Sequence, residues 1–587
     1  MRPACRQAGE ESRSGVKRTL TVCCRASQTL TTQYAKWASR AHHMERFLNN
    51  TKRLIFHRQK DILSSALILS AMMIVSRVFG FIRYRTLATY FTKEELDIFL
   101  ASFRIPDFVF ELLIAGAISS VFIPFYIKYK KGEKGEFEAN VSSIINLLLT
   151  SLFVLTLFLF VTAGFIIPKI TPGFDTETLQ LVIQLSQILL LTQLPLLVIG
   201  NIVSAVGQAN KIFIITAAAP VLYNIGIIGG TILFAQKFWL FGPIIGVLVG
   251  ALLFFLVQLP VISITRFRFI PFIFKKMALI EYSRLFIPRL FSVMTAQIDV
   301  TIDLTLSTLL GSGNYTVFFF AQSLQLLPIS VVGMAYGQAS VPYFAELFKE
   351  NKIGEIKRLV VDSVLQLFYL VIPFSIFMIF ARTPLVRLVF GGPKFDWAGT
   401  NLTAVTLSFF AISIPAHTIF YFLTRVFYAM HDTKTPLYIN IVSIAINTLI
   451  SVMSVLVFHL PVWSLAIAFS IGMIFNVILH FIFLYKKVGG YDVAKLVKNT
   501  IKIYSITAVS ALAAYVLMKM LALFALDTTR TFHIFILLSV TFSVYCGIYL
   551  FFSWFFNIEE IYVLTKLFTK IDAMKRRITD VYSDVSR

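Results

Sequence analysis

Long apolar runs separated by short polar breaks dominate the chain from about residue 60 to residue 556. Many of these runs carry few or no charges and are long enough for an α-helix to cross a bilayer, which takes roughly 18 residues or more. Dividing the chain at its polar breaks predicts fourteen helices. Their expected starts are residues 62, 96, 140, 178, 212, 239, 280, 314, 356, 400, 435, 462, 499 and 531. The pattern predicts an all-α polytopic membrane protein.

Composition and charge agree with that class. The chain of 587 residues is 57% hydrophobic and 14% charged, whereas about a quarter of the residues are charged in a soluble protein. The net charge of +23 is concentrated in residues 1–60, which hold 13 Lys or Arg against 3 Asp or Glu, in short loops and in the tail. This placement favours segments that face anionic lipid headgroups and argues against a nucleic-acid partner.

The distribution of basic residues over alternate connections predicts the topology. With the N-terminus inside, the six inner connections hold nineteen Lys or Arg and the seven outer ones hold seven, so both termini are expected in the cytoplasm. Residues 557–578 have apolar positions at helical spacing among basic ones, and we expect them to lie on the inner membrane surface. Residues 1–43 lack the apolar core of a secretory signal peptide, and we expect translation to start at Met44.

An internal repeat indicates two similar halves. "SSVFIPFYIKYKKGEK" after the second helix resembles "QASVPYFAELFKENK" after the eighth, with Pro124 and Pro342 at corresponding positions. "GQANKIFIITAAAPVLYN" resembles "MHDTKTPLYINIVSIAIN", with Lys211 matching Lys434 and Asn224 matching Asn447. Two units of six helices in the same orientation are therefore expected, which is a usual build of alternating-access transporters.

This repeat sets the predicted domains. They are a basic N-terminal segment at 1–60, an N-lobe at 61–277 with helices 1 to 6, a C-lobe at 278–490 with helices 7 to 12, a final pair of helices at 491–556 and a basic amphipathic tail at 557–587.

Charged residues within the apolar segments are the candidate functional residues, because each costs on the order of 3 kcal/mol at the bilayer centre. Arg77 and Arg83 of the first helix are six residues apart and point about 120° from each other on an ideal helix. They reach one cavity only if the helix bends, which Gly80 between them allows. A guanidinium fork suits phosphate, so an amphiphile with an anionic headgroup is favoured over a neutral solute.

Further charges are open to more than one interpretation. Asp97, Arg104 and Glu111 lie in the second helix and Arg289 in the seventh. Internal salt bridges or snorkelling from a helix end are the alternative explanation for such residues, above all for Asp97.

The seventh helix also carries an acidic pair. Asp299 and Asp303 are four residues apart and share one helix face, so a proton, a bound cation or a structural role are all open. No arrangement of nucleophile, base or metal ligands points to an enzyme.

At its first two helices the chain resembles the MurJ (MviN) family of lipid II flippases, within the MOP exporter superfamily. The residues that carry the resemblance are "SRVFGFIRYRTLATYF" and "LDIFLASFRIPDFVFELLIAGAISSVFIPFY". "GQANKIFIITAAAPVLYNI" and "HDTKTPLYINIVSIAIN" support it. The resemblance covers about residues 60–560, and the family layout of fourteen helices matches the expected count.

The resemblance implies transport of undecaprenyl-diphosphate-linked peptidoglycan precursor across the bacterial inner membrane. It assigns the attraction of the diphosphate to Arg77 and Arg83, and the outer helix-2 acid of the family to Asp97. A sodium site of the family carries over to Asp303 and Asn447, and coupling to sodium or to the membrane potential is expected. Membrane lipids and cell-wall synthesis proteins are candidate partners, and a monomer is expected.

Four positions depart from the family pattern. Glu111 stands near a family arginine, Ala115 replaces the acid of "GEGA", Ser323 stands where the eighth helix carries an arginine, and Ser451 replaces the second carboxylate of the sodium site.

Two cavity arginines are thus absent, for which Arg104 or Arg289 could compensate. A flippase for another polyprenyl-diphosphate-linked glycan, of the O-antigen type, is therefore the main alternative. A cation-coupled multidrug antiporter would favour an acid-dominated cavity, and a non-transporting scaffold would tolerate neutral residues at Arg77 and Arg83.

Overall fold

The structure is a computed structural model that describes residues 62–562 apart from residue 131. Within this range the chain forms helices joined by short connections and contains no β-strand. The predicted N-terminal segment lies outside the described residues. So does most of the predicted tail, of which only the short turn η4 (Glu559–Ile561) is seen.

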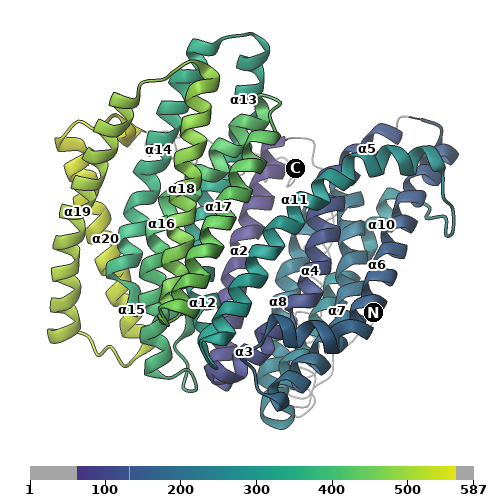
Figure 1. Cartoon of the computed structure of the whole chain (residues 1–587), viewed down its shortest axis with the longest axis horizontal. Helices are drawn as coiled ribbons and strands as arrows, with labels where there is room; N and C mark the ends of the chain where they lie inside the picture. The colour runs from purple at the N-terminus through teal and green to yellow at the C-terminus, as the bar shows by residue number, and fades with distance from the viewer. Residues whose placement is uncertain (1–61, 131, 563–587) are drawn as a thin grey trace, which may run out of the picture.

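Figure 1 shows two groups of upright helices side by side, with α2 and α11 between them. The first group comprises α2 (Ile62–Tyr90), α3 (Lys93–Ser102), α4 (Arg104–Glu111), η1 (Leu112–Phe122), α5 (Ile123–Tyr129), α6 (Lys134–Ile170), α7 (Thr176–Ala209), α8 (Ile214–Phe238), α9 (Phe241–Leu256) and α10 (Leu259–Thr265). The second comprises α11 (Lys276–Leu309), α12 (Asn314–Pro328), η2 (Ile329–Met334), α13 (Ala335–Lys349), α14 (Ile353–Phe380), α15 (Arg382–Phe390), α16 (Trp397–Ala429), α17 (Lys434–Val452), η3 (Met453–Val457), α18 (Trp463–Val488), α19 (Val493–Phe524) and α20 (Thr531–Phe555).

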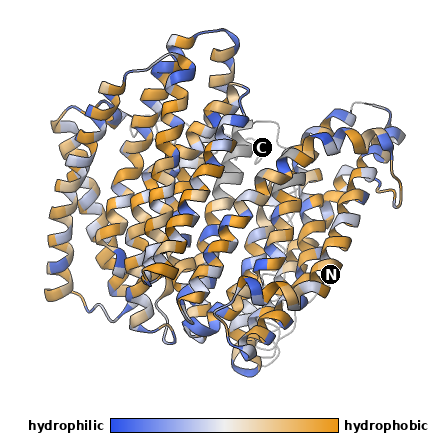
Figure 2. Ribbon diagram, in the orientation of Figure 1, coloured by the Kyte–Doolittle hydropathy of each residue, from blue (hydrophilic) through white to orange (hydrophobic). Residues whose placement is uncertain are grey.

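The helices have the length and composition of membrane spans. In the described part of the chain, twelve are long and apolar enough to cross a bilayer. Their middles are apolar, while hydrophilic residues gather at both ends of the bundle (Figure 2). This confirms the all-α polytopic class. The expected count of fourteen also includes α2 and the run from α3 to α5, which are not among the twelve, so that number stays a prediction.

The predicted helix starts lie within six residues of the observed ones. The largest shifts are at α6, which begins at Lys134 rather than 140, and at α19, which begins at Val493 rather than 499. Both helices open with a polar turn, "KGEFEA" and "VAKLVK", that a division at polar breaks leaves out. Helices extend beyond the hydrocarbon core into the headgroup region, where polar side chains are solvated.

Two π-helical segments occur at equivalent places of the repeat. The run α4–η1–α5 contains Pro124 just after η1, and α12–η2–α13 contains Pro342 shortly after η2. Such wide turns leave backbone groups with altered partners and are frequent at functional sites. Their recurrence supports the two-lobe interpretation, and the lobe boundaries themselves stay predictions.

Helices α8 and α9 pack closely through glycine. A Cβ built at Gly226 would clash with the backbone of Gly250, and one at Gly230 with the backbone of Gly246. Small residues let helix backbones approach in a membrane, where association depends on close contact rather than on water exclusion. Helix α2 packs on α8, so the closely packed α8–α9 pair supports α2.

Candidate transport cavity

Three adjoining hollows of about 230, 520 and 330 Å³ lie between the two groups of helices. They share lining residues, and Gln322 of α12 lines all three. We refer to them together as the central cavity. Its walls come from α2, α3, α4 and α8 on one side and from α11, α12, α16, α17 and α18 on the other.

Arg77 and Arg83 of α2 line the same 520 Å³ part of the central cavity. The helix runs without a break from Ile62 to Tyr90, so the expected bend at Gly80 is not required. On a helix, position 80 lies about 60° from both arginines, midway between them. Gly80 carries no side chain, and a Cβ there would meet no described atom within 4 Å, so the helix surface between the two arginines is open.

These arginines have no carboxylate within 4 Å among the described residues. The Arg83 guanidinium lies over the Tyr84 ring, 4.5 Å from its centroid. Its Nε is buried and has no hydrogen-bond partner in the part of the chain that the structure describes. A buried donor without an acceptor is costly, so an anion in this part of the cavity would supply what Arg83 lacks.

Arg104 also lines the central cavity, but most of its donors are already used. Its Nη2 donates to the carbonyl and side-chain oxygens of Gln297 at 2.7 and 2.8 Å, and its Nε donates to Thr301 at 3.1 Å. The side chain is buried, and its hydrogen bonds link α4 to α11. Asp107, one turn along α4, faces the same part of the cavity. Arg104 therefore has the position of a substitute cavity arginine, with few donors left for a ligand.

Asp97 lies apart from the central cavity and is fully buried. Its carboxylate accepts hydrogen bonds from the backbone N–H of Gly313 and of Thr316 and from the Thr316 hydroxyl, each at 2.6 Å. These groups form the N-terminus of α12, where backbone N–H groups are free and a negative charge is favoured. The family resemblance places Asp97 among the substrate-binding residues. In the structure its hydrogen-bond partners belong instead to the start of α12.

Glu111 and Arg289 do not line the central cavity either. Glu111 is half-buried at the end of α4. Arg289 of α11 is half-buried, and its Nε has no hydrogen-bond partner among residues 62–130 and 132–562. The structure thus does not bring the six predicted binding residues together. It gathers Arg77, Arg83 and Arg104 and leaves the other three outside.

The opposite wall of the central cavity is acidic and amide-rich. Asp299 and Asp303 of α11 both line it, and the Nδ2 of Asn447 donates to Asp299 at 3.1 Å. Asp303 is buried, and the Ser451 hydroxyl lies 3.5 Å from the Asn447 carbonyl oxygen. Asp303 and Asn447, the two residues of the predicted sodium site, therefore line the same part of the cavity, and Asp299 is the carboxylate bonded to Asn447.

This set of oxygen atoms suits a hard cation. Among the described residues no three His, Cys, Asp or Glu side chains are close enough to hold a metal ion. A sodium ion here would need carbonyl or hydroxyl oxygens beside the carboxylates, and the site stays a prediction.

Comparison with known families decides what the chain is related to. The model of the family "Lipid II flippase MurJ" matches residues 87–560, most of the chain. The chain belongs to the MurJ family. Curated relatives agree along most of their length. A probable lipid II flippase MurJ of Borreliella burgdorferi is 25% identical over 77% of this chain and 89% of its own. The lipid II flippase MurJ of Burkholderia cenocepacia is 25% identical over 73% and 84%.

Solved structures place the MurJ fold within a wider group. A lipid II flippase MurJ in an inward closed conformation matches with a TM-score of 0.68 at 22% identity, over 83% of this chain and 99% of that one. An inward-facing multidrug resistance MATE transporter of the MOP superfamily matches with a TM-score of 0.62 at 14% identity, over 72% and 98%. At these identities the likeness concerns the fold, and it confirms the MOP-type architecture.

Besides Glu111, two departures from the MurJ pattern can be placed. Ser323 lines the cavity beside the α2 arginines and donates to the carbonyl of Phe320 at 2.8 Å, so a small neutral group occupies the position of a family arginine. Ser451 is buried beside Asn447. The side chain of Ala115 lies outside the described residues.

Sequence reasoning missed many residues of the cavity, among them two tyrosines and a glutamine that line more than one part. Arg83 lines the 230 and 520 Å³ parts of the cavity, and Tyr84 and Tyr223 line the same two parts. The side chain of Gln193 donates to the Tyr223 hydroxyl at 3.0 Å. Gln322 lines every part. A search for charges passes over such residues. For Tyr84 the signal would have been its place two helical turns beyond Arg77, which puts both on one face of the helix.

Proposed function

We propose that the protein is a transporter that moves lipid II, an undecaprenyl-diphosphate-linked peptidoglycan precursor, from the inner to the outer leaflet of the bacterial inner membrane. The observation that carries the proposal is the pair Arg77 and Arg83, which line one cavity around an empty Gly80 position and have no carboxylate partner among the described residues. The names of the relatives support the substrate.

The mechanism that we propose is alternating access without covalent chemistry. The two arginines attract the diphosphate, with the paired donors of each guanidinium matching phosphate oxygens. The glycan and peptide occupy the wider cavity, and the polyprenyl tail stays among the lipids. Both termini are placed in the cytoplasm by the excess of basic residues on that side. Return of the empty carrier is driven by the membrane potential or by a cation at the Asp299–Asp303 wall, and a monomer suffices for this cycle.

A flippase for another polyprenyl-diphosphate-linked glycan is the second candidate. It is favoured by Ser323, which leaves the cavity with one guanidinium fewer than the family pattern has. A multidrug antiporter shares the fold, but the unpaired arginines of the α2 wall would repel the cations that such antiporters carry.

Complementation of a strain depleted of its lipid II flippase tests the proposal. The wild-type chain should restore growth, and Arg77→Ala and Arg83→Ala should fail although they reach the membrane in equal amounts. Lys169→Ala, which removes a cation outside the cavity, is the matched control. Rescue by both arginine variants would refute capture of the diphosphate by α2. Failure of the wild type to restore growth, with restored export of an O-antigen-type glycan instead, would favour the second candidate.

A further inference from the structure

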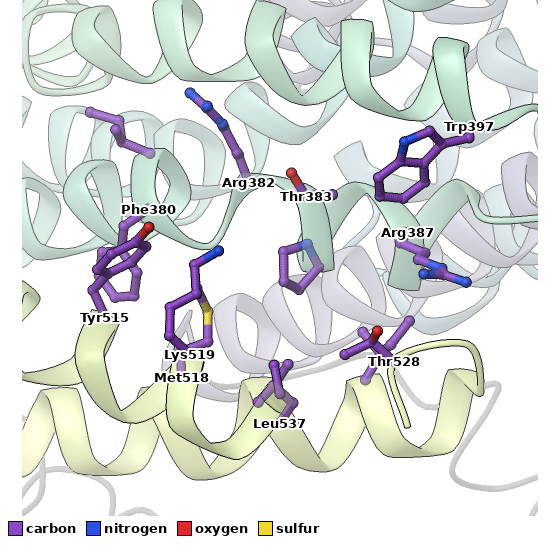
Figure 3. Close-up of a pocket in the computed structure, with 14 residues that line it drawn as sticks. Phe380, Arg382, Thr383, Arg387, Trp397, Tyr515, Met518, Lys519, Thr528 and Leu537 are labelled. Carbon is purple, nitrogen blue, oxygen red and sulfur yellow. The ribbon is translucent and has the colours of Figure 1, made fainter. Parts of the chain in front are cut away.

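A second cavity of about 550 Å³ lies apart from the central one and shares no residue with it. It is enclosed by the end of α14, by α15 and by the start of α16 on one side, and by α19 and α20 on the other (Figure 3). We call it the α15–α20 pocket. The topology that we propose places it at the outer surface of the membrane.

Of the described residues that line the α15–α20 pocket, three are cations and none is Asp or Glu. Arg382 donates to the Ser408 hydroxyl at 3.1 Å and thereby points toward α16. Arg387 lies 5.7 Å from the centroid of the Trp397 ring, and Lys519 lies 5.6 Å from that of Tyr515. Within the described residues none of the three has a carboxylate within 4 Å. Figure 3 shows Lys519 beside Tyr515 and Met518 at one end of the lining and Arg387 beside Trp397 at the other end.

The acids that border the pocket are already paired. Asp396 accepts from Lys93 at 2.9 Å and from the backbone N–H of Gly399, where it begins α16. Asp527 accepts from Thr529 and lies 3.5 Å from Arg530. Neither is available to balance the cations of the pocket.

Two neighbouring features add positive charge. The N-terminus of α15, whose first turn contains the pocket residues Thr383 and Pro384, has no side-chain cap from the described residues. The helix dipole favours an anion at such an end. At the other end of α15, Arg85 of α2 donates to the carbonyls of Arg387 and Leu388. Arg382 and Lys519 are exposed and Arg387 is half-buried. Like charges gathered at one place repel, and an anion among them relieves that repulsion.

The inner wall of the pocket is apolar. Phe380, Met518, Ile534 and Leu537 line it, and α19 and α20 both have the length and composition of membrane spans. A ligand that fits both walls has an anionic head and an apolar body. We propose that the α15–α20 pocket binds the phosphate headgroup of a membrane lipid, through Arg387 and Lys519.

The test uses the full-length protein in a neutral detergent, with lipid binding followed by native mass spectrometry and by the shift of the thermal midpoint. The probes are phosphatidylglycerol, undecaprenyl diphosphate, the net-neutral phosphatidylcholine and inorganic phosphate. The double variant Arg387→Gln/Lys519→Gln removes two charges and keeps much of the side-chain length. Lys169→Gln/Lys237→Gln removes two charges from exposed residues that also lie beside an aromatic ring, and it is the matched control.

We expect an anionic lipid to bind the wild type and the control equally, and the double variant to bind it at least about tenfold more weakly, because two charge-assisted contacts are lost. Stronger binding of phosphatidylglycerol assigns the pocket to bulk phospholipid, and stronger binding of undecaprenyl diphosphate assigns it to the lipid carrier. Equal binding by the wild type and the double variant would overturn the proposal. So would equal stabilisation by phosphatidylcholine or by inorganic phosphate alone. The test measures binding without transport, so it stands whether or not lipid II is the cargo.

Discussion

The function of a charged residue in this protein depends on whether its donors are already used. Arg77 and Arg83 keep their guanidinium groups open toward the cavity, whereas Arg85, two positions from Arg83, donates to two carbonyls of α15 and to the Thr531 hydroxyl. The first two are therefore suited to a ligand, and the third joins α2, α15 and α20.

The bare position between the two arginines gives the first prediction. Gly80→Leu should abolish or strongly reduce transport, because its side chain would fill the space between the guanidinium groups. The fold should tolerate it, since a Cβ at Gly80 meets no atom of the described residues within 4 Å. Gly164→Leu on α6 is the control, because Gly164 is exposed and has equally open surroundings. Growth rescue and membrane yield would be measured together. Full rescue by Gly80→Leu would show that the ligand does not pass between the arginines.

Asp97 gives the second residue-scale prediction. Asp97→Ala should lower the free energy of unfolding by about 2 to 4 kcal/mol, because three buried donors of α12 lose their acceptor. Asp97→Asn should cost less, since one side-chain oxygen remains. Asp107→Asn, at a cavity-facing acid of α4, should leave stability nearly unchanged. Thermal unfolding in detergent checks the order. Normal stability of Asp97→Asn combined with lost transport would instead indicate a direct contact with substrate.

At the scale of the helices, the sequence predicts periodicity and length well and partners poorly. The starts of the helices follow from hydropathy. The shared cavity of Arg77 and Arg83 does not follow from helix geometry alone, because the sequence predicts a bend at Gly80 and α2 is unbroken. The capping of α12 by Asp97 does not follow, because its partners Gly313 and Thr316 belong to a distant part of the sequence. The hydrogen bond from Asn447 to Asp299 likewise depends on how α11 and α17 are rotated against each other.

The α8–α9 contact gives a prediction with a control one residue away. Gly230→Leu should reduce the yield and the thermal midpoint strongly, because its Cβ would clash with the backbone of Gly246. Gly229→Leu should have little effect, since within the described chain nothing lies closer than 4 Å to a Cβ at that position. Fluorescence-detected size-exclusion chromatography after heating compares the two. Equal stability of both variants would mean that α8 and α9 are not held by this glycine contact.

At the scale of the whole molecule, the two groups of helices are in contact at one end where Lys128 and Tyr129 of α5 bond to Glu281 of α11. They are also in contact at the end where α3, α12 and α16 meet. Lys93 pairs with Asp396 at 2.9 Å, and its carbonyl accepts from the Thr316 hydroxyl at 2.9 Å. Asp97 closes the same end through α12. Under the alternating access that we propose, these contacts have to separate when the cavity opens at this end. We refer to them as the gate.

A reversible lock tests this gate. In a cysteine-free background, Lys93→Cys/Asp396→Cys joined by a short bifunctional methanethiosulfonate should stop transport, and a reducing agent should restore it. A long, flexible reagent of the same chemistry should leave transport partly active, because it permits the two sides to separate. Lys169→Cys/Asp175→Cys, which joins the end of α6 to the start of α7 within one group of helices, should be harmless with either reagent. Undiminished transport by the short-linked Lys93→Cys/Asp396→Cys protein would mean that this end stays closed throughout the cycle and that the substrate leaves by another route.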